Sequence, residues 1–238
     1  SFLAMAGLAW ALKREADAAE AEDVAIEQKE KAQEARGAAD EIVTAMTTDV
    51  RWELEKFGRS HQVADLMKTA REYFRTYPPE EKSREVRRGE ASAQSASTRS
   101  SLELGDGKEA LSTAIKGTEI MEQLVFEFPQ VSEYRRALAI SYREIGQAKQ
   151  LLEGTRAAAV FYKRSVDRLA DLFGREPDSE NARHLAMSLQ SLGESERLLN
   201  GAGAALPHYE EAQRIILAER GRNSTLIGDY DLAVSHQQ

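Results

Sequence analysis

The chain has 238 residues, and 32 Lys and Arg stand against 40 Asp and Glu, a formal net charge of −8. This acidic balance, with no strongly basic segment, argues against a nucleic-acid-binding protein. No cysteine is present, which excludes disulfides, thiolate metal sites and cysteine nucleophiles. Only five prolines and fifteen glycines occur in a sequence rich in Ala, Glu, Leu and Arg, and this composition predicts an all-α protein.

Residues 1–12, SFLAMAGLAWAL, are apolar and are followed at once by Lys13 and Arg14. A helix needs about 20 apolar residues to cross a bilayer, so this stretch alone cannot span one. Two interpretations stay open: the end of a membrane helix that begins before Ser1, or the apolar start of a helix in water. A signal peptide is disfavoured because its charged residues would precede the apolar stretch. We expect a cytoplasmic protein, tethered to the inner face of a membrane under the first interpretation.

Residues 13–79 are predicted to form a long helix followed by an antiparallel partner helix. No proline and a single glycine occur in residues 13–57, which favours one continuous helix. Residues 13–35 carry mostly alanine and charge, whereas apolar residues recur every four positions in residues 42–57. A second apolar pattern in residues 63–77 ends at two prolines, and we expect it to pack against the first pattern.

Residues 80–238 contain an internal repeat with a period of 47 residues. The matching pairs are Leu138 and Leu185, Gly146 and Gly193, Gly154 and Gly201, and Tyr162 and Tyr209. A fixed period of this length is typical of stacked helical repeats. The predicted units are 80–130, 131–177 and 178–224, with a partial unit at 225–238. Because the last unit has no polar cap, we expect the natural protein to continue beyond Gln238.

Glycines and small residues predict how each unit is built. Gly146 and Gly193 fall mid-helix, where glycine costs about 1 kcal/mol relative to alanine, so Tyr162 and Tyr209 of the following helix are expected to fill the space over them. Turns are predicted at Gly154, at Gly201 and at Gly105-Asp106-Gly107. The segment ASAQSASTRSS at 91–101 is either a flexible linker or a helix whose small side chains admit a close neighbour, and its position one repeat upstream favours the helix.

The units resemble the tetratricopeptide repeat in their pattern of small and large residues. The pattern is Tyr142, Ile145, Gly146, Ala158 and Tyr162 in one unit and Leu189, Leu192, Gly193, Ala205 and Tyr209 in the next. The period exceeds the family's usual value of about 34, and Lys149 and Glu196 stand where the family has an aromatic residue. The resemblance implies an α-solenoid of antiparallel helix hairpins, of the long-helix variety found in bacterial multidomain proteins. Residues 39–59 also look like the segment that joins a membrane helix to such repeats, which implies a signalling or effector domain elsewhere in the full-length protein.

No constellation of catalytic or metal-ligating residues is evident. The four histidines, His61, His184, His208 and His236, are far apart in the sequence, and His184 is expected to be a packing or surface residue. The segment from Gly105 to Lys108 lacks the glycine and Ser/Thr positions of a phosphate-binding loop, and no Gly-x-Ser-x-Gly elbow occurs. We therefore expect no enzyme activity, no metal and no cofactor.

In the tetratricopeptide family the first helix of each unit lines a concave groove. The resemblance places on this groove Arg143, Gln147 and Gln150 from one unit and Gln190, Glu194 and Arg197 from the next. These polar residues are predicted to bind a protein or peptide partner, or another domain of the same full-length chain. The competing interpretation is that they are ordinary exposed helix residues.

The predicted function is thus a non-catalytic interaction scaffold, the regulatory or sensor region of a larger bacterial signalling protein. The alternative is a structural oligomerisation module, in which residues 13–35 and 42–57 pair between chains as a coiled coil. The sequence does not identify the partner.

Overall fold

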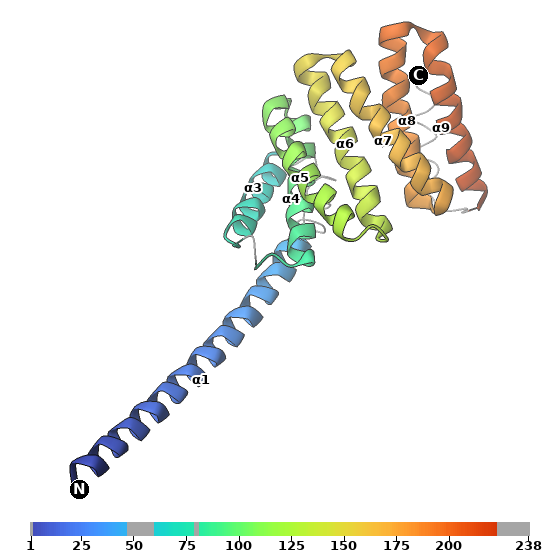
Figure 1. Cartoon of the computed structure of the whole chain (residues 1–238). Coiled ribbons are helices and arrows are strands. Elements are labelled where there is room, and N and C mark those ends of the chain that lie inside the picture. Colours follow the sequence, from blue (N-terminus) through green and yellow to red (C-terminus); the bar gives the residue numbers. More distant parts are fainter. Residues whose placement is uncertain (1, 47–59, 79–80, 223–238) are drawn as a thin grey trace. The chain divides into compact units, whose positions relative to one another are not determined.

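The computed structural model describes residues 2–46, 60–78 and 81–222 (Figure 1). The regular elements in these ranges are α-helices, and no strand occurs among them. The helices are α1 (Phe2–Ala45), α3 (Ser60–Arg75), α4 (Arg84–Glu103), α5 (Gly107–Glu127), α6 (Ser132–Glu153), α7 (Thr155–Arg175), α8 (Ser179–Asn200) and α9 (Ala202–Arg222). The prediction of an all-α protein is therefore confirmed.

The chain divides into two units, residues 1–45 and residues 46–238, and each is described by itself. The first unit is α1, whose side chains are exposed throughout residues 22–34. Within this stretch Lys31 Nζ pairs with Glu27 Oε1 at 2.6 Å, one helical turn earlier. No helix of the described residues holds an apolar stretch long enough to cross a membrane. The expected packing of residues 42–57 on the next helix falls largely on residues 47–59, outside the described ranges.

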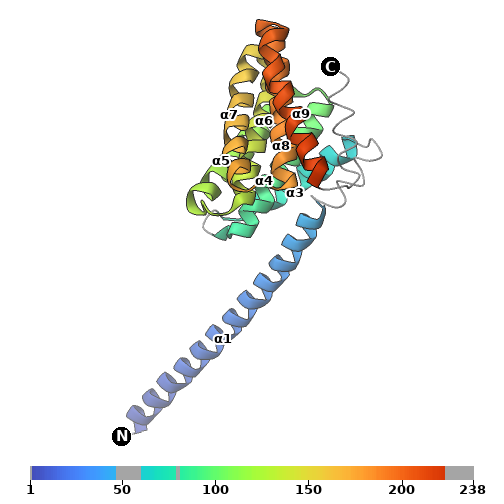
Figure 2. The ribbon, with the colours of Figure 1, turned by 90° about the vertical axis from the view of Figure 1, so that its right-hand side faces the viewer.

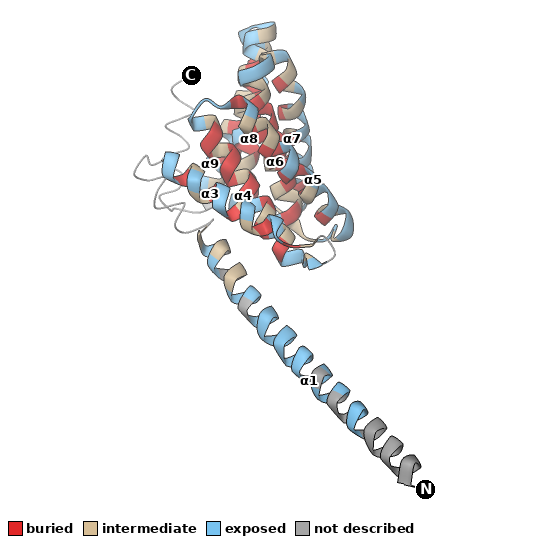
Figure 3. Ribbon diagram, turned by 90° about the vertical axis from the view of Figure 1, so that its left-hand side faces the viewer, coloured by how far each residue is buried: buried red, intermediate tan, exposed pale blue. Residues whose placement is uncertain are grey.

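In the second unit, helices α3 to α9 pack in a series (Figures 1 and 2). Each helix contacts the next one along the chain, and α6 also contacts both α4 and α8. Buried residues lie between successive helices (Figure 3). One apolar cluster joins Ala139 of α6 and Leu169 of α7 to Leu185 of α8 and Ile215 of α9. The core therefore extends from one predicted repeat unit into the next, as expected when each unit buries its apolar face against a neighbour.

Local sequence determines where these helices begin and end. The side chains of Ser83, Asp106 and Asp178 accept hydrogen bonds from backbone N–H groups at the starts of α4, α5 and α8. Single glycines connect α6 to α7 and α8 to α9. Gly154 has φ 87° and Gly201 has φ 90°, a conformation that strains any residue with a Cβ. The turns predicted at both glycines are confirmed.

The mid-helix glycines are contact points between paired helices. A Cβ on Gly146 would lie 2.6 Å from Cε1 of Tyr162, and a Cβ on Gly193 would lie 2.9 Å from Cε1 of Tyr209. Both tyrosine rings therefore occupy the space that a larger residue would need. The predicted pairing of each glycine with its tyrosine is confirmed, and close packing offsets the cost of glycine within a helix.

The small-residue segment 91–101 lies within α4, so its interpretation as a helix is confirmed. Ala93 and Ala96 are fully buried. Thr98 of the same helix and Thr113 of α5 share a buried hydrogen bond of 2.8 Å between their Oγ1 atoms. Gly117 of α5 lies so close to α4 that a Cβ there would be 3.2 Å from Cβ of Gln94. Small side chains thus let α5 approach α4 closely.

Candidate binding face on α4, α6 and α8

The first helices of the successive units, α4, α6 and α8, form a face on which equivalent residues follow one another. Two cavities open among them. The α6–α8 cavity has a volume of about 400 Å³, and the α4–α6–α8 cavity has a volume of about 520 Å³. Arg143 and Met187 line both cavities, so the two are neighbours on one face.

The α6–α8 cavity brings together five of the six residues that the sequence placed on the groove. They are Arg143, Gln147, Gln150, Gln190 and Glu194. Arg197 does not line this cavity. Its Nη2 and Nε instead donate to the two carboxylate oxygens of Glu194, at 2.6 and 2.8 Å. Arg197 therefore holds a groove residue in place from outside the cavity.

The five residues differ in how free they are to meet a partner. Gln147 is exposed, while Gln150 and Gln190 are half-buried. Gln150 Nε2 donates to Thr155 Oγ1 at 3.0 Å, which leaves its carbonyl oxygen for a further contact. The hydrogen bonds from Arg197 hold the pKa of Glu194 below its usual range, so this carboxylate is charged at neutral pH.

Arg143 departs from the expectation of an accessible groove residue. Its side chain is only 8% exposed, and its helix α6 contacts α4 and α8 as well as α5 and α7. No described residue accepts a hydrogen bond from its Nε or Nη1. Burial lowers the pKa of Arg143, yet an arginine starts from so high a value that it stays charged at neutral pH. Arg143 is thus a buried cation, and we expect its substitution to affect folding.

Glu144 is a site residue that the sequence reasoning missed. It is 2% exposed, and its Oε1 accepts from Ser95 Oγ at 2.6 Å and from Arg99 Nη1 at 3.1 Å, both on α4. Its other oxygen, Oε2, has no partner among the described residues. The signal in the sequence was that Ser97 and Ser191, 47 positions before and after Glu144, are small. The charged Glu144 therefore departs from the pattern of small residues at this repeat position.

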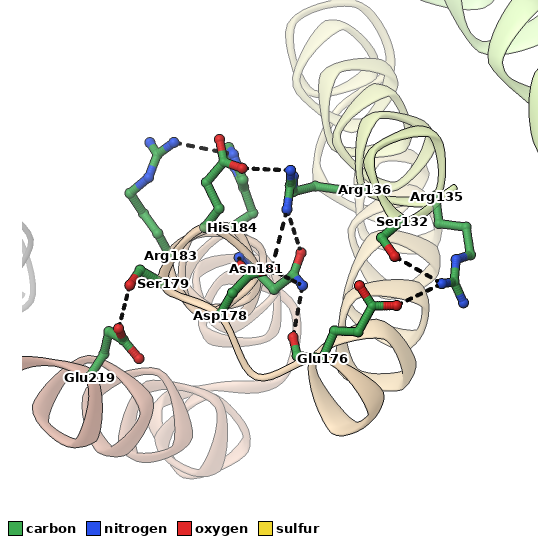
Figure 4. Close-up of polar contacts among 11 residues, drawn as sticks. Ser132, Arg135, Arg136, Glu176, Asp178, Ser179, Asn181, Arg183, His184 and Glu219 are labelled. Carbon is green, nitrogen blue, oxygen red and sulfur yellow. Dashed lines mark hydrogen bonds and ion pairs between the residues drawn. The ribbon is translucent and has the colours of Figure 1, made fainter. Parts of the chain in front are cut away.

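Arg183 and His184 of α8 also line the α4–α6–α8 cavity, and Figure 4 shows the two side chains next to each other. Arg183 Nη2 lies 3.2 Å from His184 Nε2. Burial, reinforced by surrounding arginines, lowers the pKa of His184 to about 3, so the ring is neutral at pH 7. Since a guanidinium can only donate, Nε2 is the acceptor and Nδ1 carries the proton. That Nδ1–H is buried and has no acceptor among the described residues.

Ion pairs between successive first helices explain why Arg183 differs from its counterparts. Arg88 of α4 pairs with Glu133 of α6. One unit later, Arg136 Nη2 pairs with Glu180 Oε2 at 2.5 Å. Arg183 is the next arginine in this series, 47 positions after Arg136. No anionic partner for it lies within the residues that the structure describes.

The comparisons with known proteins return no relative. No protein-family model matches the chain, and neither the curated proteins nor the solved structures yielded a match. What this face could bind is therefore inferred from its own side chains. Three glutamines, the charged carboxylate of Glu194 and the buried Arg143 supply hydrogen bonds and charge in adjacent cavities. In residues 2–46, 60–78 and 81–222, no group of three or more His, Asp or Glu side chains is arranged to hold a metal ion.

Proposed function

We propose that residues 80–238 form a tetratricopeptide-like α-solenoid that binds a peptide segment of a partner protein on the face of α4, α6 and α8, without catalysis. The observation that carries this proposal is the α6–α8 cavity, in which residues one repeat apart line a single hollow. The resemblances in the sequence favour a regulatory or sensor region of a larger bacterial signalling protein.

The packing of the helices supports the choice of face. Direct contacts link α4 to α6 and α6 to α8, whereas the second helices α5, α7 and α9 have no comparable contacts with one another. A stack in which the first helices are closer together than the second helices curves toward the first. The inner side of such a stack is an extended surface that suits a peptide.

The side chains of the α6–α8 cavity suit a peptide backbone. Each glutamine amide offers two donors and an acceptor, so Gln147, Gln150 and Gln190 can pair with both N–H and C=O groups. Polar contacts of this kind fit an extended segment held by main-chain hydrogen bonds better than an apolar helix. The exposed apolar residues that flank the cavity are few, Met187 and Leu198 being the clearest.

A selection from a random 12-residue peptide library against the whole chain tests this function. Fluorescence anisotropy of the selected peptide should show at least a tenfold loss of affinity in the double variant Gln147→Ala/Gln190→Ala. The matched control is Gln123→Ala, which removes an exposed glutamine of α5 that lines neither cavity. Equal affinity of the double variant and the control would rule out the proposed face.

A further inference from the structure

The α4–α6–α8 cavity has an unbalanced set of charges. Its basic lining residues are Arg88, Arg99, Arg143 and Arg183, and its acidic ones are Glu133, Glu144 and Glu180. Each acidic residue already has a cation: Arg88 for Glu133 and Arg99 for Glu144. Glu180 pairs with Arg136, which lies outside the lining. Neither Arg143 nor Arg183 forms an ion pair among the described residues, although the nearby charge of Glu144 partly offsets the lowering of the pKa of Arg143.

Several hydrogen-bond donors of residues that line this cavity are buried from water and have no acceptor among the described residues. Nε and Nη1 of Arg143 are buried, and its side chain is more than nine-tenths buried overall. His184 lines the same cavity, and its Nδ1–H is a third buried donor without an acceptor among the described residues. A buried polar group without a partner is rare in a folded protein and requires an explanation. Three such donors around one cavity are explained together by one acceptor-rich ligand.

We propose that the α4–α6–α8 cavity binds a phosphate group, either as the free ion or as a small monoester. The oxygens of the phosphate accept from Arg143, Arg183 and the Nδ1–H of His184. Arginine is the side chain best suited to phosphate because its guanidinium presents several donors in a fixed plane. A volume of about 520 Å³ lies within the range of small-molecule pockets.

Glu144 distinguishes phosphate from a simple carboxylate. Its Oε2 is buried beside the same cavity and has no donor among the described residues. A singly protonated phosphate carries both acceptor oxygens for the arginines and a P–OH that can donate to Glu144. Acetate offers acceptors alone, so it would leave Oε2 without a partner and face the charge of Glu144 directly.

This site adjoins the α6–α8 cavity and shares Arg143 with it, but the two proposals are tested on different residues. It uses Arg143, Arg183 and His184, whereas the peptide test removes Gln147 and Gln190. Failure of one proposal therefore leaves the other standing, and the two sets of variants tell the failures apart.

Isothermal titration calorimetry on the whole chain, in chloride buffer at constant ionic strength, tests the site with inorganic phosphate, glycerol 3-phosphate and acetate. We expect phosphate to bind at least tenfold more tightly than acetate. The result with glycerol 3-phosphate identifies the source: equal or tighter binding indicates a monoester, and weaker binding indicates the free ion. No binding of either phosphate probe, or equal binding of acetate, would overturn the proposal.

The variant Arg143→Met keeps an unbranched, apolar side chain in place of the arginine stem and removes the guanidinium, and it should weaken phosphate binding at least tenfold. The control is Lys163→Met, an exposed lysine of α7 outside the cavity. At tenfold excess over the wild-type dissociation constant, phosphate should raise the midpoint of thermal unfolding of the wild type by about 2–4 °C more than that of Arg143→Met. Comparing the two proteins removes the general stabilisation that phosphate salts give any protein. If Arg143→Met does not fold, Arg183→Gln serves in its place, and unchanged affinity in that variant would overturn the site.

Discussion

Replacing Gly146 with alanine tests how closely α6 and α7 are packed. The added Cβ would lie 2.6 and 2.7 Å from Cε1 and Cδ1 of Tyr162, well inside van der Waals contact. The ring cannot swing aside freely because Tyr162 is 6% exposed and packs with Ala158 and Leu192. The helix or the ring must therefore shift.

Two opposing effects determine the size of the change. Alanine gains about 1 kcal/mol over glycine in a helix interior, and overpacking of a buried site costs about 1–3 kcal/mol. The net expectation is a free energy of unfolding lower by roughly 0–2 kcal/mol. Gly174 of α7 has nothing within 4 Å of an added Cβ, so Gly174→Ala is the control and should gain up to about 1 kcal/mol. Gly193→Ala, with its nearest contact at 2.9 Å, should fall between the two.

Urea denaturation followed by circular dichroism measures these differences. Gly146→Ala should be about 1–3 kcal/mol less stable than Gly174→Ala. In a Tyr162→Leu background the ring atoms are gone, and the same glycine substitution should become neutral or stabilising. If Gly146→Ala and Gly174→Ala stabilise the protein equally, the reasoning about the contact with Tyr162 is wrong.

Three further predictions follow from the buried charges and from α1. Because the pKa of His184 is lower in the folded chain than its ordinary 6.5, protons bind preferentially to the unfolded chain, and stability should fall as pH drops below 6.5 toward 3. By pH 5 this loss should be about 2 kcal/mol in urea titrations, and His184→Asn should remove it. Glu144→Ala should lower the free energy of unfolding by about 1–3 kcal/mol, because Arg99 and Ser95 lose their buried acceptor. A change within about 0.5 kcal/mol, which is typical of a surface substitution, would contradict this role. Light scattering with and without residues 1–45 tests the oligomerisation alternative, and a monomer in both cases would exclude pairing through α1.

Local features of this fold could be predicted from the sequence because they depend on few residues. Gly154 and Gly201 end helices through their own conformational freedom, which no distant residue supplies. The spacing of Gly146 and Tyr162 likewise predicted a contact, because the same pair recurs 47 positions later. The repeat therefore predicts contacts between helices as well as the positions of the helices.

Which residues of the candidate site are buried was harder to predict, because burial depends on how successive units stack. Arg143 occupies a position where the repeat pattern permits an exposed residue, yet α4 and α8 cover it. Glu144 lies on the side of α6 that faces α4, where the pattern gives no reason for a carboxylate. Sequence periodicity identifies which helix face is shared between units, whereas the distance between units decides which of its charges are buried.

The location of a bound peptide tests the central proposal most directly. A photoreactive benzoylphenylalanine placed at Gln147 of α6, or at Gln123 of α5 as the control, would be irradiated with the selected peptide and analysed by mass spectrometry. We expect a cross-link from position 147 and none from position 123. A cross-link from position 123 alone, or equal yields from both, would contradict a binding face on α4, α6 and α8.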